Sequence, residues 1–223
     1  MNILLINGSP KGKASNSLRL AKSFIEGVSE QHANEDVTVE QLNVATMDIK
    51  PCKGCFHCWK NTPGQCIMSD DEETVIQKQL WADLVIWSFP LYYFNVPGLL
   101  KNLIDRQLPM SLPFMSDANR GYGSGAHESR YDMTGKKHVL ISTCGFYSSE
   151  GNYDSVTKMF DHILGKGNYE SIFCGQGELF RVKELSARTD QYLALVKKAG
   201  IEYAQGGISD QTKAELKVLL YPK

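Results

Sequence analysis

The sequence lacks the features of a membrane protein and of a sequence-independent nucleic-acid binder. No apolar stretch in its 223 residues approaches the roughly 20 needed to cross a bilayer as a helix. Its 24 lysine and arginine residues nearly balance 25 aspartate and glutamate residues, and no basic run is long enough to follow a phosphate backbone. These absences favour a small-molecule partner over a nucleic acid or a membrane.

The chain also lacks the motifs of a hydrolase. It contains no Ser-His-Asp order, no paired carboxylates with a base and no H-E-x-x-H segment. A strand is expected from residue 2 onward, so we expect no signal peptide and a cytoplasmic location. In that reducing setting the six cysteines are interpreted as thiols or metal ligands, not as a disulfide framework.

What the sequence does contain is a regular alternation of apolar strands and amphipathic helices, with an ordinary 42% of hydrophobic residues. We expect residues 1–223 to form a single domain. Five strands are predicted, at residues 2–7, 36–42, 83–88, 137–143 and 169–174. Two long connections interrupt the pattern: a cysteine-rich loop at 44–69 and an inserted loop at 108–135, rich in proline and glycine and of the kind that forms a lid or an interface.

This alternation predicts an α/β fold with right-handed crossovers, in which a doubly wound, five-stranded parallel sheet carries helices on both faces. For the flavodoxin-like strand order 2-1-3-4-5, ligands bind at the carboxyl ends of strands 1 and 3, where the winding changes direction. The loops after these two strands are therefore the first places to search for a site.

The loop after the first strand has the composition of a phosphate site. Gly8 and Gly12 break the strand, and a helix then begins whose free N–H groups point back at the loop. Polar groups suited to a phosphate monoester come from Ser9, Lys11, Ser15, Asn16 and Ser17, and Ser15 and Ser17 are also expected to cap the helix. The glycine spacing excludes a P-loop and a dinucleotide fingerprint, whereas a capped helix after a polar loop explains the same residues nearly as well.

The loop after the third strand offers a flat apolar surface. Its residues are Pro90, Leu91, Tyr92, Tyr93, Phe94 and Asn95, and such a run of aromatics between prolines cannot all face inward. The loop after the fourth strand, Thr143, Cys144, Gly145 and Phe146, would lie beside it. Aromatic faces and amide groups together suit the apolar faces and polar edge of a flavin ring.

Four cysteines in the 44–69 connection form a second constellation. Cys52, Cys55, Cys58 and Cys66 are separated by two, two and seven residues. Thiolates at this density can hold a tetrahedral metal ion or a cubane cluster. Three alternatives stay open on spacing alone: an iron-sulfur cluster, free thiols and zinc.

The segments Asn7–Lys11, Ser15–Ser17, Pro90–Tyr93, Val96–Gly98 and Leu100–Arg106 together resemble the flavodoxin-like NAD(P)H-dependent FMN reductase and quinone reductase superfamily. The resemblance spans residues 1 to about 180. It implies FMN bound by its phosphate at residues 9–17 and by its ring at 90–95 and 143–146, usually in a homodimer. It also implies NAD(P)H as electron donor and a quinone, flavin or similar small molecule as acceptor. The cysteine motif is similar to that of the iron-sulfur flavoprotein branch, whose four cysteines hold a [4Fe-4S] cluster.

Three functions therefore compete. The leading one is an FMN-dependent NAD(P)H oxidoreductase, and the second is an iron-sulfur flavoprotein that carries electrons between protein partners. The third is a non-catalytic flavin-binding module that responds to redox state or metal.

Overall fold

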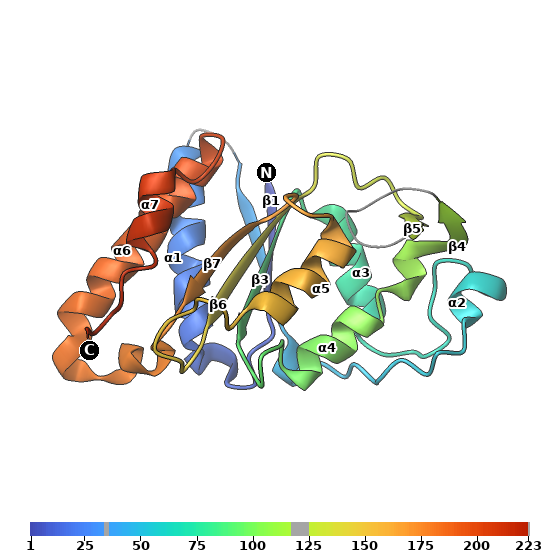
Figure 1. Ribbon diagram of the computed structural model, residues 1–223. Helices are drawn as coiled ribbons and strands as arrows, with labels where there is room; N and C mark the ends of the chain where they lie inside the picture. Colours follow the sequence, from blue (N-terminus) through green and yellow to red (C-terminus); the bar gives the residue numbers. More distant parts are fainter. Residues whose placement is uncertain (34–35, 117–124, 223) are drawn as a thin grey trace.

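The computed structural model describes residues 1–33, 36–116 and 125–222. Its main sheet has five parallel strands in the order β2-β1-β3-β6-β7 (Figure 1). The strands are β1 (Asn2–Asn7), β2 (Thr38–Asn43), β3 (Leu84–Pro90), β6 (Lys137–Thr143) and β7 (Glu170–Cys174). Because β6 and β7 are the fourth and fifth strands of this sheet, the predicted flavodoxin-like order 2-1-3-4-5 is confirmed.

The burial of each strand follows its residue pattern. The apolar runs of β1 and β3 are buried along almost their whole length, as a central strand covered on both faces requires. The alternating strand β2 pairs only with β1 and lies at one edge of the sheet, as its half-polar sequence predicts.

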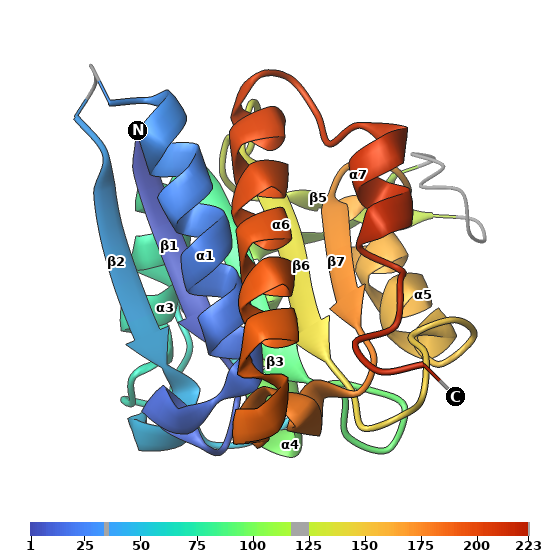
Figure 2. The ribbon, with the colours of Figure 1, turned by 90° about the vertical axis from the view of Figure 1, so that its left-hand side faces the viewer.

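Helices cover both faces of the sheet (Figure 2). One face carries α1 (Asn16–Gln31), α6 (Ser186–Ala204) and α7 (Asp210–Glu215), and the other carries α3 (Glu72–Trp81), α4 (Gly98–Asp105) and α5 (Asp154–Leu164). Two separate apolar cores result, one on each side of the sheet. No helix in the described part of the chain is both long and apolar enough to cross a membrane.

Helices α1 and α6 pack closely because each has a glycine at the contact. A Cβ atom on Gly27 would lie 2.0 Å from the carbonyl oxygen of Lys197, and one on Gly200 would lie 2.1 Å from that of Phe24. The backbones therefore touch at these two positions, where no larger residue fits.

The two long connections contain regular structure that the sequence analysis did not predict. The cysteine-rich connection holds a 3-10 turn (η2, Val44–Thr46) and a short helix (α2, His57–Lys60). The inserted segment holds a 3-10 turn (η3, Leu108–Met110) and an antiparallel pair, β4 (Ser111–Ser116) with β5 (Ala126–Ser129). The interpretation of 108–135 as a loop without strands was wrong, because Pro113 and the irregular register hide the pattern; residues 117–124, between the strands, lie outside the described residues.

Two helix boundaries also differ from the prediction. Acidic residues suit a first helical turn, so the sequence predicts a helix that begins at Asp70 and Asp71; α3 begins instead at Glu72, since Asp70 takes part in an ion pair described below. The sequence also predicts a final helix over 212–220, whereas α7 ends at Glu215.

Candidate functional sites

The predicted phosphate loop lies at the carboxyl end of β1, against β3 and α4. The Gly8 N–H donates to the Ser88 carbonyl at 2.8 Å, and a Cβ atom on Gly8 would lie only 2.6 Å from Leu100 Cδ2. The buried Asn7 side chain accepts from the Ser9 N–H and donates to the Gly12 carbonyl. Residues 7–12 are thus held rigidly by the strand that precedes them.

The polar side chains of this loop have different roles. Ser15 caps α1, since its hydroxyl accepts from the Leu18 N–H at 3.3 Å, but Ser17 does not cap. Ser17 is fully buried inside the first turn, where its hydroxyl pairs with that of Thr143 at 3.0 Å. The Asn16 amide donates to the Gly177 carbonyl at 2.7 Å.

The groups left to meet an anion are mainly backbone donors and one cation. The N–H groups of Asn16 and Ser17 stand in the first turn of α1, where the helix supplies no carbonyl to accept them. The Ser9 hydroxyl is 1% exposed and accepts from the Lys11 N–H, while the Lys11 side chain is exposed. A helix start with free N–H groups and a nearby ammonium fits a phosphate.

The loop after β3 forms a tight turn of an unusual kind. Tyr92 and Asn95 exchange two backbone hydrogen bonds of 2.8 and 3.0 Å, and the two residues between them, Tyr93 and Phe94, have φ angles of 48° and 64°. Left-handed backbone at bulky residues costs about 1–2 kcal/mol each. Strain of this kind is concentrated at functional sites in proteins.

The aromatic side chains of this turn face outward, as predicted. Tyr92, Tyr93 and Phe94 are 44%, 98% and 47% exposed. The Phe94 ring stacks on Phe146 with centroids 5.2 Å apart, so the loops after β3 and β6 share one aromatic surface. The Phe94 carbonyl also accepts a hydrogen bond from the Ser155 hydroxyl, which ties the turn to α5.

The remaining predicted flavin-site residues frame this surface. The Leu91 N–H donates to the Thr143 carbonyl at 2.8 Å, and Gly145 is exposed beside Phe146. The side chains of Leu91 and Cys144 pack in the core, where burial raises the pKa of the Cys144 thiol. Pro90 and Asn95 are half-buried at the ends of the turn. The structure therefore brings the three predicted loops to one edge of the sheet, with Tyr93 pointing furthest into solvent.

The four motif cysteines line a single pocket. Cys58 is buried and Cys52 and Cys55 are exposed. Cys66 completes the set, and the pocket walls include Phe56, Leu108, Pro109 and Arg106. Burial, and then the nearby Cys66, raise the pKa of Cys58.

These thiols do not converge on one point. Among residues 1–33, 36–116 and 125–222, no three histidine, cysteine or acidic side chains are arranged to hold a single metal ion. A cubane cluster needs its four thiolates spread around it, one on each iron, instead of meeting at one ion. Four thiols that line one pocket are the donor set that a [4Fe-4S] cluster uses.

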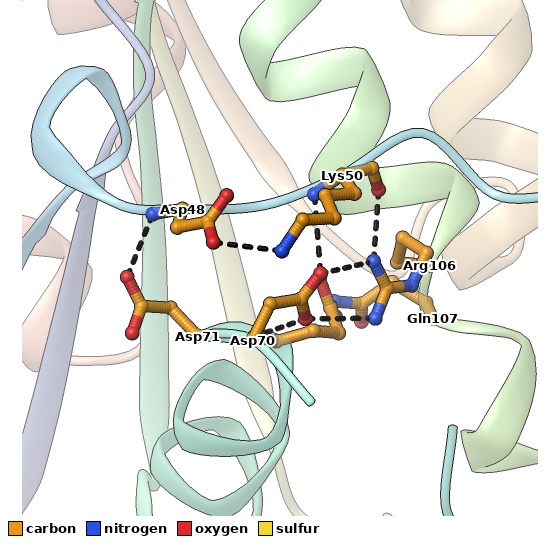
Figure 3. Close-up of polar contacts among 7 residues, drawn as sticks. Asp48, Lys50, Asp70, Asp71, Arg106 and Gln107 are labelled. Carbon is orange, nitrogen blue, oxygen red and sulfur yellow. Dashed lines mark hydrogen bonds and ion pairs between the residues drawn. The ribbon is translucent and has the colours of Figure 1, made fainter. Parts of the chain in front are cut away.

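A buried ion pair closes the base of the cysteine loop, which we define as residues 50–70 (Figure 3). Arg106, at the end of α4, donates from Nη1 and Nη2 to the two carboxylate oxygens of Asp70 at 2.7 and 2.8 Å. Both side chains are at most 1% exposed. Nη1 also donates to the Lys50 carbonyl at 2.8 Å, so one guanidinium joins the two ends of the loop.

Each member of this ion pair shifts the pKa of the other. Burial by itself raises the pKa of Asp70, but the hydrogen bonds from Arg106, Lys50 and Glu72 outweigh it and hold that pKa below its usual value. Burial likewise lowers the pKa of Arg106, and the hydrogen bond to Asp70 and the nearby Cys66 outweigh this effect and raise it. Both groups therefore stay ionised.

Glu72, beside the pair, behaves differently. It is 1% exposed, and burial raises its pKa to about 8, although Arg106 opposes the shift. One oxygen accepts from the Gln107 amide at 3.4 Å, while Oε2 has no partner among the described residues. Glu72 is consequently a neutral acid near pH 7 within a network of ions.

The inserted hairpin packs on the cysteine loop. The Trp59 indole N–H donates to the Leu108 carbonyl at 3.1 Å, and its ring lies 4.7 Å from that of His127 on β5. The insertion expected as a lid or interface thus forms part of the wall around the cysteines.

Sequence analysis missed the roles of Arg106, Asp70 and Glu72. Arg106 lies in a segment noted only for its family resemblance, and Asp70 was assigned to a helix start. The available signal was a basic residue at the end of an apolar helix, but nothing in the local sequence identifies its partner 36 residues away.

Comparison with known proteins agrees with this architecture. A family described by its flavodoxin-like fold matches residues 1–179. The chain belongs to this flavodoxin-like family.

Particular relatives refine the comparison. An FMN-dependent NADH:quinone oxidoreductase of Pseudomonas syringae pv. tomato is 31% identical over 73% of this chain and 75% of its own length. An iron-sulfur flavoprotein of Archaeoglobus fulgidus is 38% identical over 106 residues, about half of each chain. Among solved structures, an NAD(P)H:quinone oxidoreductase from Methanothermobacter marburgensis superimposes with a TM-score of 0.64 at 19% identity, covering 91% of this chain and 96% of its own.

Proposed function

We propose that this protein is an FMN-dependent oxidoreductase that passes electrons from NAD(P)H to a quinone, flavin or similar small acceptor. One observation carries the proposal: the helix start at Asn16 and the aromatic turn at Tyr92–Asn95 flank the same edge of the sheet, at the β1/β3 switch point. The relative from Pseudomonas syringae supports it, because that FMN-dependent NADH:quinone oxidoreductase is 31% identical over 73% of this chain.

Separate groups of residues would bind the phosphate and the ring of FMN. The N–H groups of Asn16 and Ser17, with Ser9, Ser15 and Lys11, would hold the FMN phosphate. Tyr92, Tyr93 and Phe94 would flank the ring together with Phe146, while backbone groups of Pro90–Asn95 and Thr143–Phe146 would meet its polar edge. When bound, FMN accepts a hydride from the nicotinamide and passes electrons on.

The loop favours this role because hydrogen bonds within the fold hold it in place. The Asn7 amide donates to the Gly12 carbonyl and so holds the loop after β1. The Ser17–Thr143 hydrogen bond holds the loops after β1 and β6 relative to each other. A preformed site loses less entropy on binding.

The decisive test is flavin content and turnover. We expect anaerobically purified protein to bind FMN stoichiometrically and to oxidise NADH or NADPH in the presence of a quinone. Absence of FMN affinity would refute the proposal, and bound FMN without turnover of either nicotinamide would favour the non-catalytic module.

We further infer that the enzyme is a homodimer working in the cytoplasm. The exposed Tyr93 and Phe94 at the rim of the candidate site are apolar surface that a second copy can cover, and all six cysteines are free thiols, which suits a reducing compartment. Light scattering after size-exclusion chromatography tests the first inference, and a monomer at micromolar concentration would contradict it.

A specific observation supports a second function. The four cysteines line one pocket, so we infer that they hold a [4Fe-4S] cluster, as in an iron-sulfur flavoprotein that carries electrons between partners. Iron and sulfide content with broad visible absorption would support this, and wild-type protein free of iron after anaerobic reconstitution would refute it.

A further inference from the structure

The cysteine loop leaves and rejoins the body of the protein at one point. The Asp48 N–H donates to the Asp71 carboxylate at 2.7 Å, and the Asp71 N–H donates to the Asp48 carbonyl at 3.0 Å. The Lys50 N–H donates to Asp70 Oδ2 at 3.2 Å. The Arg106 guanidinium then joins the Lys50 carbonyl and the Asp70 carboxylate, as Figure 3 shows.

The same guanidinium forms part of the pocket wall. Arg106 lines the pocket together with all four cysteines, whereas Asp70 is not among the lining residues. The ion pair therefore has a direction, with its positive end nearer the cysteines and its negative end behind.

One donor of Arg106 is unused. The Nε–H is buried and has no partner in the described part of the chain, although both terminal nitrogens are bonded. Buried N–H groups are almost always paired in native proteins, so an unpaired one beside a pocket indicates an acceptor supplied by whatever binds there.

We propose that Arg106 is the positioning residue of the four-cysteine site: it closes the cysteine loop and directs a buried positive charge and a free N–H at the anionic cluster that the thiolates hold. Four thiolates bring four negative charges to the pocket. A guanidinium at its wall offsets part of this charge, and it stabilises the reduced form more than the oxidised form because the reduced cluster carries one more electron. This inference rests on the second function proposed above.

The test uses FMN-loaded full-length protein, reconstituted anaerobically with iron and sulfide. The midpoint of cluster reduction is measured by mediated titration, following the cluster's visible and electron paramagnetic resonance spectra. We expect Arg106→Gln to shift the one-electron equilibrium at least tenfold toward the oxidised cluster, which is 59 mV. We expect Asp70→Asn to shift it in the opposite direction, because the guanidinium is then no longer neutralised.

Lys53→Gln is the matched control. Lys53 lines the same pocket and carries the same charge, but it is exposed, so water and salt screen it and we expect a shift below twofold. A residue that only braces the loop would not give shifts of opposite sign for Arg106→Gln and Asp70→Asn. Shifts of the same sign, or no shift with the cluster retained, would overturn the inference.

Arg106→Gln can fail to fold, because it leaves the Asp70 carboxylate buried without a partner. The double variant Asp70→Asn/Arg106→Gln leaves no uncompensated charge, and the inference requires it to shift toward the oxidised form, since the guanidinium is the nearer of the two charges. A wild-type protein that binds FMN but takes up no iron would overturn both the cluster and this role of Arg106, and would leave the oxidoreductase function standing.

Discussion

The candidate flavin site and the four-cysteine pocket are built in contrasting ways. The first lies on loops that leave the ends of β1, β3 and β6, so the sheet itself determines where its residues stand. The second lies beside the sheet, on a loop and a hairpin that Figure 1 shows at the far end of the molecule from α1 and α6. A buried ion pair between Arg106, after α4, and Asp70, before α3, helps to hold it in place.

Different interactions stabilise the two sites. The flavin site is maintained by many short backbone and hydroxyl bonds, each of which contributes modestly. The cysteine pocket is held by backbone bonds as well, but it also contains a charge pair whose loss leaves an ion buried without a partner. Single substitutions should therefore damage the second region far more than the first.

The largest effect is expected from breaking the ion pair. Asp70→Asn should lower the free energy of unfolding by about 3–5 kcal/mol, because Arg106 is then buried without its counter-ion. Urea denaturation measures this. Asp48→Asn breaks the exposed Lys50–Asp48 pair at the same loop base and should change stability little. Equal effects from the two variants would show that the ion pair does not hold the loop.

The next effect depends on pH. Folded Glu72 keeps its proton up to about pH 8, whereas the unfolded chain releases it near the ordinary value of 4.5, so stability falls as pH rises between these values. Glu72→Gln should remove this slope, so between pH 4.5 and pH 8 the variant should gain on the order of 4 kcal/mol in free energy of unfolding relative to the wild type. Unfolding curves across this range measure the slope. The exposed neighbour Glu73→Gln should leave it unchanged, and a wild-type slope in Glu72→Gln would contradict the assignment.

A smaller effect is expected at the phosphate loop. Ser9→Ala with Asn16→Ala should weaken FMN binding more than tenfold, about 1.4 kcal/mol, because polar partners of the phosphate and the Asn16–Gly177 link are lost. Fluorescence titration with FMN measures it. Asn168→Ala is the control, since that amide also donates to a backbone carbonyl but stands at the opposite edge of the sheet. An unchanged dissociation constant in the double variant would remove this loop from the site.

The smallest effect concerns backbone strain in the aromatic turn. Tyr93→Gly should raise the free energy of unfolding by about 0.5 kcal/mol. Glycine adopts a φ of 48° without strain, and the greater entropy of the unfolded glycine chain cancels only part of this stabilisation. The same variant should weaken FMN binding, since the ring is lost. Tyr93→Ala removes the ring but keeps the strain, so it should weaken binding without the gain in stability. Equal stability for the two variants would show that the turn is not strained.

The sequence predicted much of the first region because its signals are local. The apolar run of residues 2–7, the glycine that follows and the cap at Ser15 each lie within a few residues of the structure they produce. The aromatic residues Tyr92, Tyr93 and Phe94 face solvent, as the prolines and the length of their run predicted. Ser17 was misassigned as a cap because its partner, Thr143, is 126 residues away.

By itself, the sequence determined the sheet, its strand order and the chemistry of its loops, since hydrophobic periodicity, breakers and caps act between neighbouring residues. Only the tertiary structure decided that four spaced cysteines face one pocket, that Leu108 and Pro109 of the inserted segment line it, and that Arg106 and Asp70 close the base of the cysteine loop. The physical reason is that a buried charge selects its partner through space, where folding brings distant segments together and excludes water, and no local pattern encodes that choice.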